Sequence, residues 1–451
     1  MQSLTSKNKI LFMLAATGVL SVMSSTIEAQ NEQSGNPGNS GNRISRDSDV
    51  SRTNKNTGSQ NADTYRFSKR HKMPPTQSPH RPSPGANAQF GDPLPGLDNK
   101  SLAAFLEGRE EFEAQETAEG GIGPIFNNTS CVACHSAGAT GGASDEKVTR
   151  FGRLEDGVFD PLESLGGSLL QANAIDPAVQ EVVPPQANVI AQRLSTPTFG
   201  AGLIEAIPDE TILGNQRRRK PIGIAGRAAQ VIDPVSGETR IGRFGWKAQH
   251  ATVLGIAADA YVNEMGITSR IFPTENAPNG RTDLLEQYDL VPDVEDPIDP
   301  ETGKSDIDHS ADYMRFLAAP PVVRLSRSAL AGKRLFEKVQ CAACHTPVMF
   351  TGANEVSALA NQRVALYSDL LLHDMGSLND RIAQSGAGSN EMRTAPLWGL
   401  RVRTSFLHDG RARTASEAIQ MHDGEAAQSR EQFLSLTTEE QQQIIDFLNS
   451  I

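Results

Sequence analysis

The sequence has few of the features that mark several common protein classes. Its 42 basic residues are outnumbered by 54 acidic ones, which gives a formal net charge of −12 and argues against a nucleic-acid binder with a basic face. Aromatic residues make up only 5% of the 451-residue chain, and four cysteines are too few for a disulfide-stapled scaffold of this length. Hydrophobic residues nevertheless reach 38%, so a folded core is feasible.

Long apolar runs are also scarce, and the main one lies at the N-terminus. Lys7 and Lys9 precede the apolar residues 10–22, and small polar residues then lead to Ala29. This order is typical of a secretory signal peptide. We expect residues 1–29 to be removed, leaving an exported, periplasmic protein without a transmembrane helix. An uncleaved membrane anchor is the alternative, because the residues before Ala29 form an imperfect cleavage site.

Residues 30–89 contain almost no large apolar side chains and are rich in Asn, Ser, Gly, Arg and Pro. Such a segment buries too little surface to offset its loss of conformational entropy. We expect a disordered, low-complexity tether, with the folded part of the chain beginning near Phe90.

The four cysteines carry the chemistry of the chain. They form two motifs in which a pair of cysteines, two residues apart, is followed at once by histidine: Cys131, Cys134 and His135, then Cys341, Cys344 and His345. This is the attachment pattern of c-type haem. Two thiols add to the two vinyl groups of one porphyrin, and the adjacent imidazole can ligate the iron. The sequence therefore predicts two covalently bound c-type haems.

The cysteine pairs have other interpretations. One pair alone could be half of a zinc site or a redox dithiol, and the two pairs could together build one four-cysteine zinc site. Neither alternative explains a histidine directly after both pairs. A redox dithiol also calls for a strand–helix setting and has no need of a second copy. The export signal favours haem further, since c-type haem is attached to exported proteins in bacteria.

Helical periodicity surrounds each motif. Apolar residues recur at helical spacing in residues 101–112 before the first motif and in residues 328–339 before the second. A closing helix is expected at residues 311–318 for the first motif and at residues 438–449 for the second. An opening helix, a haem-binding loop and a closing helix together make a cytochrome c domain.

We therefore expect a mainly α fold with two cytochrome c-like domains facing each other, residues 90–320 and 321–451. The first contains a long, irregular, Gly- and Pro-rich insertion, residues 149–243. Residues 230–244 have the pattern of a β-hairpin, with apolar residues on either side of a turn. The basic run 217–220 is interpreted as a solvated loop in preference to a docking or propionate-binding site.

Seven short stretches add a family resemblance to the cysteine motifs. They are Gly123–Cys131, Gly202–Pro208, Gly242–Ala248, Asn263–Thr268, Tyr367–Gly376, Arg393–Gly399 and Leu407–Ala412. With these stretches, residues 90–451 resemble the bacterial di-haem oxidoreductase family, whose members are also labelled thiol oxidoreductases. That family is related to the di-haem cytochrome c peroxidases and to MauG-type enzymes. The resemblance implies redox chemistry but no particular substrate.

The resemblance implies roles for two residues. Trp246 falls where the peroxidases place a tryptophan between the two haems, so it would relay electrons. Glu264 falls where they keep an acidic residue beside the open haem face, so it would move protons on or off peroxide. A core tryptophan and a surface glutamate are the alternatives. The glutamine that the peroxidases keep near this acid is not evident at residues 254–256.

The resemblance also bears on the ligands of haem two. His422 lands where relatives place methionine or tyrosine on the second iron, so we expect His345 and His422 to ligate it. Met421 and Met375 are the fallback ligands. A second histidine in place of methionine would lower the potential of this haem. A structural core histidine is the alternative for His422.

Haem one has His135 on one side and few candidate ligands on the other. Between residues 136 and 308 the only histidine is His250, where relatives have no ligand. We expect a five-coordinate or weakly ligated iron that could bind peroxide. Met265 and His250 are the residues most able to fill the open position.

The resemblance also makes calcium a cofactor to consider. The peroxidases bind one calcium ion with an asparagine and a Thr-Ala-Pro turn. Residues 403–405 of this chain read Arg-Thr-Ser at that turn, so the motif does not support the site.

Together these features favour an exported di-haem redox enzyme, with electron transfer between the haems and peroxidase-like or partner-oxidising chemistry at haem one. The expected partners are a small oxidant such as peroxide and an electron-donor or acceptor protein such as a small cytochrome c. A basic donor would suit the net charge of −12. The alternative is a non-catalytic electron-transfer cytochrome in which both irons are saturated.

Overall fold

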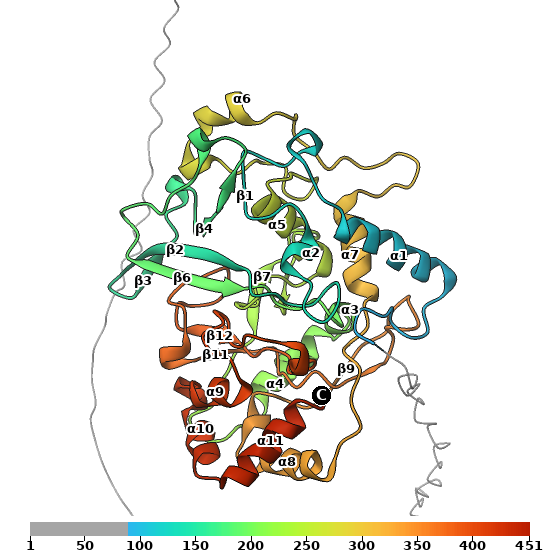
Figure 1. Cartoon of the computed structure of the whole chain (residues 1–451), viewed down its shortest axis with the longest axis vertical. Coiled ribbons are helices and arrows are strands. Elements are labelled where there is room, and N and C mark those ends of the chain that lie inside the picture. Colours follow the sequence, from blue (N-terminus) through green and yellow to red (C-terminus); the bar gives the residue numbers. More distant parts are fainter. Residues whose placement is uncertain (1–88) are drawn as a thin grey trace, which may run out of the picture. The chain divides into compact units, whose positions relative to one another are not determined.

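The computed structural model describes residues 89–451 (Figure 1). The predicted signal peptide and nearly all of the predicted tether lie outside the described residues. The described part is 34% helix and 15% strand. The expectation of a mainly α fold is therefore right only in part, since the fold leans toward helix but includes several small sheets. No helix within residues 89–451 is both long and apolar enough to cross a membrane.

The helices run through the whole described chain, with 3₁₀ turns between them. They are α1 (Asn99–Glu113), α2 (Cys131–Cys134), α3 (Ala201–Glu205), α4 (Asp209–Arg217), α5 (Val253–Ala260), the π-helix η4 (Tyr261–Met265), α6 (Leu285–Tyr288), α7 (Asp306–Phe316), α8 (Arg327–Lys338), α9 (Ala415–Gln420), α10 (Ala427–Leu434) and α11 (Thr438–Leu448).

The strands are short, and all named pairs are antiparallel. They are β1 (Ile125–Phe126), β2 (Lys147–Glu155), β3 (Val158–Asp160), β4 (Leu169–Leu170), β5 (Asn173–Ala174), β6 (Val189–Leu194), β7 (Ala229–Ile232), β8 (Thr239–Gly242), β9 (Met349–Phe350), β10 (Arg363–Val364), β11 (Leu372–Asp374) and β12 (Glu391–Arg393). β2 lies at the centre of the largest sheet, where it pairs with β3, β4 and β6.

All four predicted helices are present, as α1, α7, α8 and α11. Their starts follow from side-chain caps: the Asp98 carboxylate accepts from the backbone N–H of Ser101 before α1, and Ser326 caps α8 in the same way. The periodicity overestimated burial on α1, however. Leu102 is 37% and Leu106 is 52% exposed, whereas Phe105 and Phe112 are buried.

Two helix pairs frame the cysteine motifs, α1 against α7 and α8 against α11 (Figure 1). Each pair meets at a glycine on its opening helix. A Cβ atom at Gly108 would collide with the backbone of His309, and one at Gly332 would collide with the backbone of Gln443. Within each pair, the two helices therefore approach closely enough for backbone to touch backbone.

The predicted insertion is more ordered than its Gly- and Pro-rich sequence indicates. Six residues of β2 pair with six of β6, from Lys147 opposite Leu194 to Gly152 opposite Val189. The predicted hairpin is confirmed: β7 and β8 pair along their full length and lie within two residues of the expected limits. The insertion thus contains small sheets and the two helices α3 and α4.

The two largest hydrophobic clusters among the described residues surround the two helix pairs. The first contains Phe105, Phe112 and Tyr313 of the α1–α7 pair, and residues between 349 and 371 also pack into it. The second lies between α8, α10 and α11, around Phe336. The segment that follows the second motif therefore contributes to the core around the first.

Candidate functional site

The first cysteine motif lines a cavity of about 1730 Å³ of empty space, including its open mouth. Cys131 and Cys134 form the two ends of α2, and His135 follows directly. The Nδ1 atom of His135 lies 3.1 Å from the carbonyl oxygen of Gly142. A hydrogen bond there fixes the ring and leaves Nε2 free, which is how protein imidazoles that ligate metals are usually held. The ring of Phe112 packs 5.9 Å from that of His135.

The second motif repeats this arrangement in a cavity of about 1360 Å³, again including its mouth. His345 Nδ1 lies 3.0 Å from the carbonyl oxygen of Tyr367, and its ring packs 6.4 Å from that of Phe336. Phe336 of α8 thus packs against the histidine of the second motif as Phe112 of α1 packs against that of the first. Burial lowers the pKa of both His135 and His345 to about 4, so both imidazoles are neutral at pH 7, as metal ligation requires.

His422 lies across the second cavity from His345. The two ring centroids are 6.5 Å apart, and the Nδ1 of His422 lies 2.7 Å from the carbonyl oxygen of Ala418. Each histidine thus keeps Nε2 free. Of the fallback ligands, Met375 also lines this cavity, whereas Met421 does not line it and is 37% exposed.

The first cavity lacks such a pair. Among the described residues that line it, His135 is the only histidine, and two methionines, Met265 and Met314, also line it. His250 is buried elsewhere, with Nε2 at 3.3 Å from an oxygen of Asp259. Of the two residues expected to be able to fill an open position, only Met265 is therefore within reach.

Glu264 lines this first cavity from the π-helix η4, directly before Met265. Single-turn π-helices occur frequently at functional sites. Asn127 Nδ2 donates to Glu264 Oε2 at 2.7 Å, and Arg150 lines the same cavity. Burial raises the pKa of Glu264, while Arg150 and Asn127 act in the opposite direction. The carboxyl is therefore able to exchange a proton closer to neutral pH than an exposed glutamate.

Trp246 is one of the side chains that border both cavities. Its indole Nε1 donates to the carbonyl oxygen of Leu194 at 2.7 Å, and its ring lies edge-on to His408 with centroids 6.3 Å apart. The second tryptophan, Trp398, lines only the first cavity. Trp246 therefore lies where the linings of the two cavities meet.

Gln249 also lines the first cavity, which sequence reasoning missed. The glutamine that the peroxidases keep near the acid is absent from residues 254–256, eight to ten residues before Glu264. In the structure Gln249 reaches the same cavity from the turn that precedes α5. Its proximity to Trp246 along the chain was the available signal.

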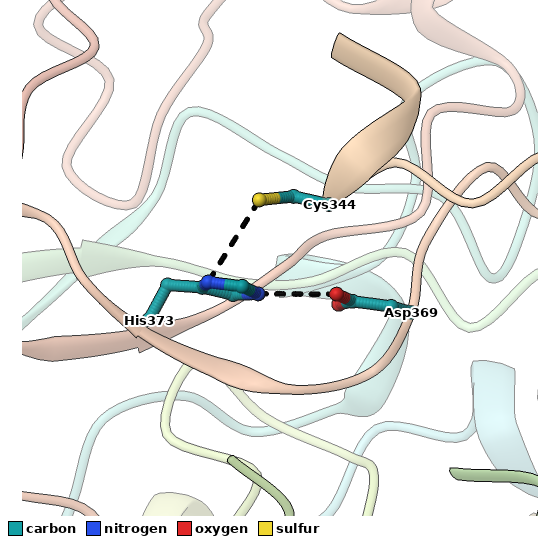
Figure 2. A group of neighbouring side chains, drawn as sticks. All are labelled: Cys344, Asp369 and His373. Carbon is teal, nitrogen blue, oxygen red and sulfur yellow. Dashed lines mark hydrogen bonds and ion pairs between the residues drawn. The ribbon is translucent and has the colours of Figure 1, made fainter. Parts of the chain in front are cut away.

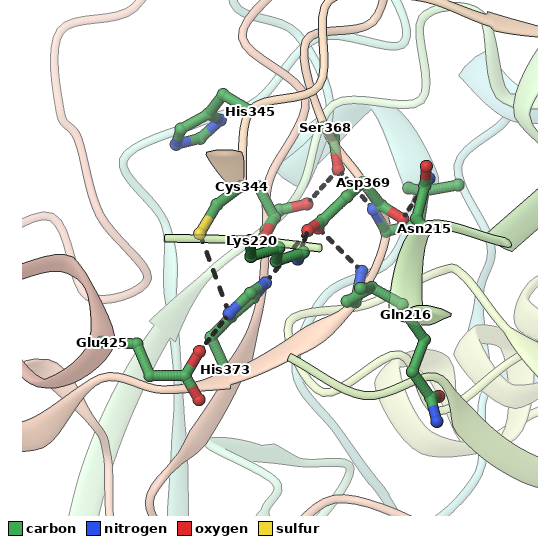
Figure 3. A network of polar contacts seen from close by, with 12 residues as sticks. Asn215, Gln216, Lys220, Cys344, His345, Ser368, Asp369, His373 and Glu425 are labelled. Atoms are coloured by element: carbon green, nitrogen blue, oxygen red, sulfur yellow. Dashed lines mark hydrogen bonds and ion pairs between the residues drawn. The ribbon is translucent and has the colours of Figure 1, made fainter. Parts of the chain in front are cut away.

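A charged network beside the second motif was also missed (Figures 2 and 3). His373 is buried, with Nε2 at 3.1 Å from Asp369 Oδ2 and Nδ1 at 2.6 Å from Glu425 Oε2. The Sγ of Cys344 lies 3.8 Å from the same Nδ1. Burial alone would lower the pKa of His373, but its bonds to the two carboxylates raise it well above its ordinary value.

Lys220 completes this network, with Nζ at 2.6 Å from Asp369 Oδ2. Its side chain is 7% exposed, so the interpretation of the basic run as a solvated loop is wrong for this residue. Cys344, Asp369 and His373 have the spacing of a metal site. Two cationic side chains already balance the two carboxylates, however, so a divalent cation is not favoured there.

The geometry of each cavity fits a c-type haem. Arg150 Nε in the first cavity, and Arg403 Nε and Nη2 at the border of both, are buried without a hydrogen-bond partner among residues 89–451. These guanidinium groups could receive the carboxylate side chains of the porphyrin. Two thiols, one supported imidazole and an unpaired cation therefore meet at each cavity.

The alternatives for the cysteine pairs fit less well. Burial raises the pKa of Cys131 to about 12 and that of Cys134 to about 11, whereas redox dithiols have a lowered thiol pKa. The two pairs line different cavities, and the described residues contain no cluster in which all four thiols converge, as one zinc site would need.

Comparison with solved structures gives only distant likenesses. They include hydrazine synthase of Kuenenia stuttgartiensis (14% identity, covering 85% of this chain and 100% of that one, TM-score 0.34). A MauG-like protein associated with microbial copper homeostasis has 15% identity, covers 80% and 92%, and has a TM-score of 0.37. The diheme peroxidase BthA of Burkholderia thailandensis has 14% identity, covers 80% and 87%, and has a TM-score of 0.35. No functional argument rests on likenesses this weak.

Comparison with protein families is decisive. No curated protein matches the chain. The family described as "Di-haem oxidoreductase, putative peroxidase" matches residues 179–451, which is more than half of the sequence and includes the second cysteine motif. The first motif precedes the matched residues. The family resemblance seen in the sequence is thereby confirmed, and the chain belongs to the di-haem oxidoreductase family of peroxidase-like enzymes.

Proposed function

We propose that this chain is an exported di-haem c-type enzyme that reduces peroxide at the first cavity and takes up electrons at the second. In this proposal residues 1–29 direct export, and residues 90–320 and 321–451 form two cytochrome c-like domains facing each other. One observation carries the proposal. Trp246 borders both cavities, of which one offers Glu264 and a single histidine, and the other is lined by four histidines, among them the facing pair His345 and His422.

Each cysteine motif would hold one haem through thioether bonds. When bound, c-type haem supplies an iron that changes oxidation state and, where an axial position is open, binds a small oxidant. His135 and His345 would hold the irons through Nε2, because their Nδ1 atoms face backbone carbonyls. His422 would be a second ligand of the iron that His345 holds. That iron would then exchange electrons with a protein such as a small cytochrome c.

Glu264 would move the proton at the first cavity. Reduction of peroxide consumes two electrons and two protons and yields two water molecules. The Glu264 carboxylate is placed to accept a proton from one peroxide oxygen and to return it to the other as water leaves. Its hydrogen bond from Asn127 holds the carboxyl in one orientation, and its raised pKa favours proton exchange.

Trp246 would carry electrons from the second cavity to the first. A buried π system between two redox centres shortens the gap that an electron crosses. The hydrogen bond to Leu194 and the edge contact with His408 hold the indole in place. Trp246 is 9% exposed, so it is shielded from solvent.

The test compares the two tryptophans of the chain. Haem-loaded protein is reduced with a small cytochrome c and mixed with peroxide in a stopped-flow spectrometer. Trp246→Phe should slow electron transfer between the haems without changing their resting spectra. Trp398→Phe, which alters a ring at the first cavity only, is the matched control and should leave that transfer unchanged.

Two outcomes would contradict the proposal. Equal transfer rates in both variants would remove Trp246 from the pathway. No peroxide turnover in the wild type, together with two six-coordinate low-spin irons by EPR, would favour the electron-transfer cytochrome instead. Oxidation of a partner protein's side chain remains the next candidate and would appear as peroxide consumption that requires that partner.

A further inference from the structure

A second group of acidic side chains lies outside both cavities. Glu275, Asp293 and Glu295 each offer a carboxylate oxygen, and these oxygens all lie within 4.8 Å of one another. None of the three residues lines either cavity. They come from the segment after the π-helix η4 and from the acidic loop before α7. The function proposed above makes no use of them.

This acidic cluster has no counter-charge in the described part of the protein. None of the three carboxylates forms a salt bridge with a described residue, in contrast to the network around His373. Glu275 is only 6% exposed, and its Oε2 atom is buried without a hydrogen-bond partner among residues 89–451. Glu295 Oε1 is likewise buried and unpartnered. Burying an ionised carboxylate without a partner is costly, so the cluster lacks something that would balance it.

The surroundings of the cluster are rich in oxygen atoms. The Thr268 hydroxyl contacts Asp293 Oδ1 at 3.2 Å and also donates to Glu295 Oε2. Gly123 lies against this cluster as well. A Cβ atom at Gly123 would collide with the carbonyl oxygen of Gly266 and with the Glu275 carboxylate. Hard cations such as calcium prefer this combination of carboxylate, hydroxyl and carbonyl oxygens.

We propose that Glu275, Asp293 and Glu295 bind one calcium ion. Calcium accepts six to eight oxygen ligands in irregular geometry and tolerates backbone carbonyls and water among them. Magnesium demands a near-ideal octahedron and is less suited to ligands that come from separate turns. The ion would supply the positive charge that no basic side chain of the described chain supplies here.

This site differs from the calcium site that the peroxidase relatives place at residues 403–405. It also has a structural consequence, because Gly266 and Thr268 lie within four residues of Glu264 in the sequence. An ion at the acidic cluster would join this turn to the loop at residues 293–295. Binding of the ion does not depend on the peroxidase chemistry proposed above.

Protonation of Glu275 is the competing explanation. Burial and the neighbouring Glu295 raise the pKa of Glu275 to about 9, so a proton would occupy this carboxyl at neutral pH when no ion is bound. A proton alone would satisfy the buried oxygen and leave the protein indifferent to calcium. The two explanations therefore make opposite predictions for calcium addition.

The experiment uses haem-loaded protein that has been treated with EDTA and then freed of it. Calcium chloride is added in a calorimetric titration, and thermal unfolding is followed with calcium, with magnesium and with neither. We expect one calcium ion per chain, bound at about 10⁻⁴ M or tighter, and a higher melting temperature with calcium than with magnesium. Glu275→Gln should abolish the binding, and Asp293→Asn should weaken it by about tenfold or more.

Controls separate lost binding from lost folding. Asp293 is exposed, so its substitution leaves the core intact if Glu275→Gln fails to fold. Glu301→Gln changes an exposed carboxylate of the same acidic loop and should leave calcium affinity unchanged. Two results would overturn the proposal: a wild-type protein whose melting temperature ignores calcium, or calcium affinity that is equal in the wild type and in Asp293→Asn.

Discussion

The two cavities have similar surroundings at the cysteine motif, but the rest of their lining differs. In both, a histidine contacts a backbone carbonyl through Nδ1, and a phenylalanine of the opening helix packs against its ring. The lining of the second cavity also includes His422, which faces His345, whereas that of the first includes Glu264 and Met265. One scaffold thus accommodates two environments, and the proposed difference in function rests on these few residues.

The largest expected effect comes from removing one cysteine pair at a time. Cys131→Ala with Cys134→Ala should abolish covalent haem at the first cavity only, and Cys341→Ala with Cys344→Ala should do so at the second only. Intact mass and a pyridine haemochrome count measure the loss. EPR of the remaining haem then shows which cavity holds the six-coordinate iron. A wild-type protein whose mass equals that of its polypeptide alone would show that neither cysteine pair carries covalent haem.

Replacing the carboxyl group of the first cavity should have the next largest effect. Glu264→Gln should lower peroxide turnover by about 10²-fold or more, the usual contribution of a positioned acid–base group, with little change in either haem spectrum. Glu146→Gln is the control, because Glu146 is an exposed carboxylate that lines the same cavity. An unchanged rate in Glu264→Gln would exclude this residue from proton transfer.

The same carboxyl sets the expected pH dependence. As a base, Glu264 must be ionised, so kcat/KM should fall as the pH drops through its pKa. Burial raises that pKa, so the fall should begin above the ~4.3 of an ordinary glutamate. This acid limb should disappear from the profile of the Glu264→Gln variant.

The smallest expected effect changes a potential and leaves both haems in place. His422→Met should raise the reduction potential of the second haem, within the ~0.8 V range over which axial ligands act. The first haem should keep its potential. Met421→Leu is the control, since Met421 is next in sequence but does not line the cavity. Equal potentials in His422→Met and the wild type would mean that His422 is a structural histidine.

Much of this comparison could be predicted from the sequence because it depends on local patterns. The cysteine motifs, the four framing helices and the β7–β8 hairpin all have short-range signals. Residues that meet only through long-range packing were not predictable. Lys220 pairs with Asp369 across 149 residues, so a basic run typical of a surface loop became part of a buried network. β2 shows no clean alternation of buried and exposed residues, and its pairing with β6 therefore left no clear strand pattern.

The glycine contacts within the two helix pairs have a mechanical consequence. Where Gly108 meets His309 and Gly332 meets Gln443, the distance between the helices is set by main-chain atoms. Any side chain at either glycine would push its two helices apart. The phenylalanine on the same helix would then move away from the imidazole that it supports.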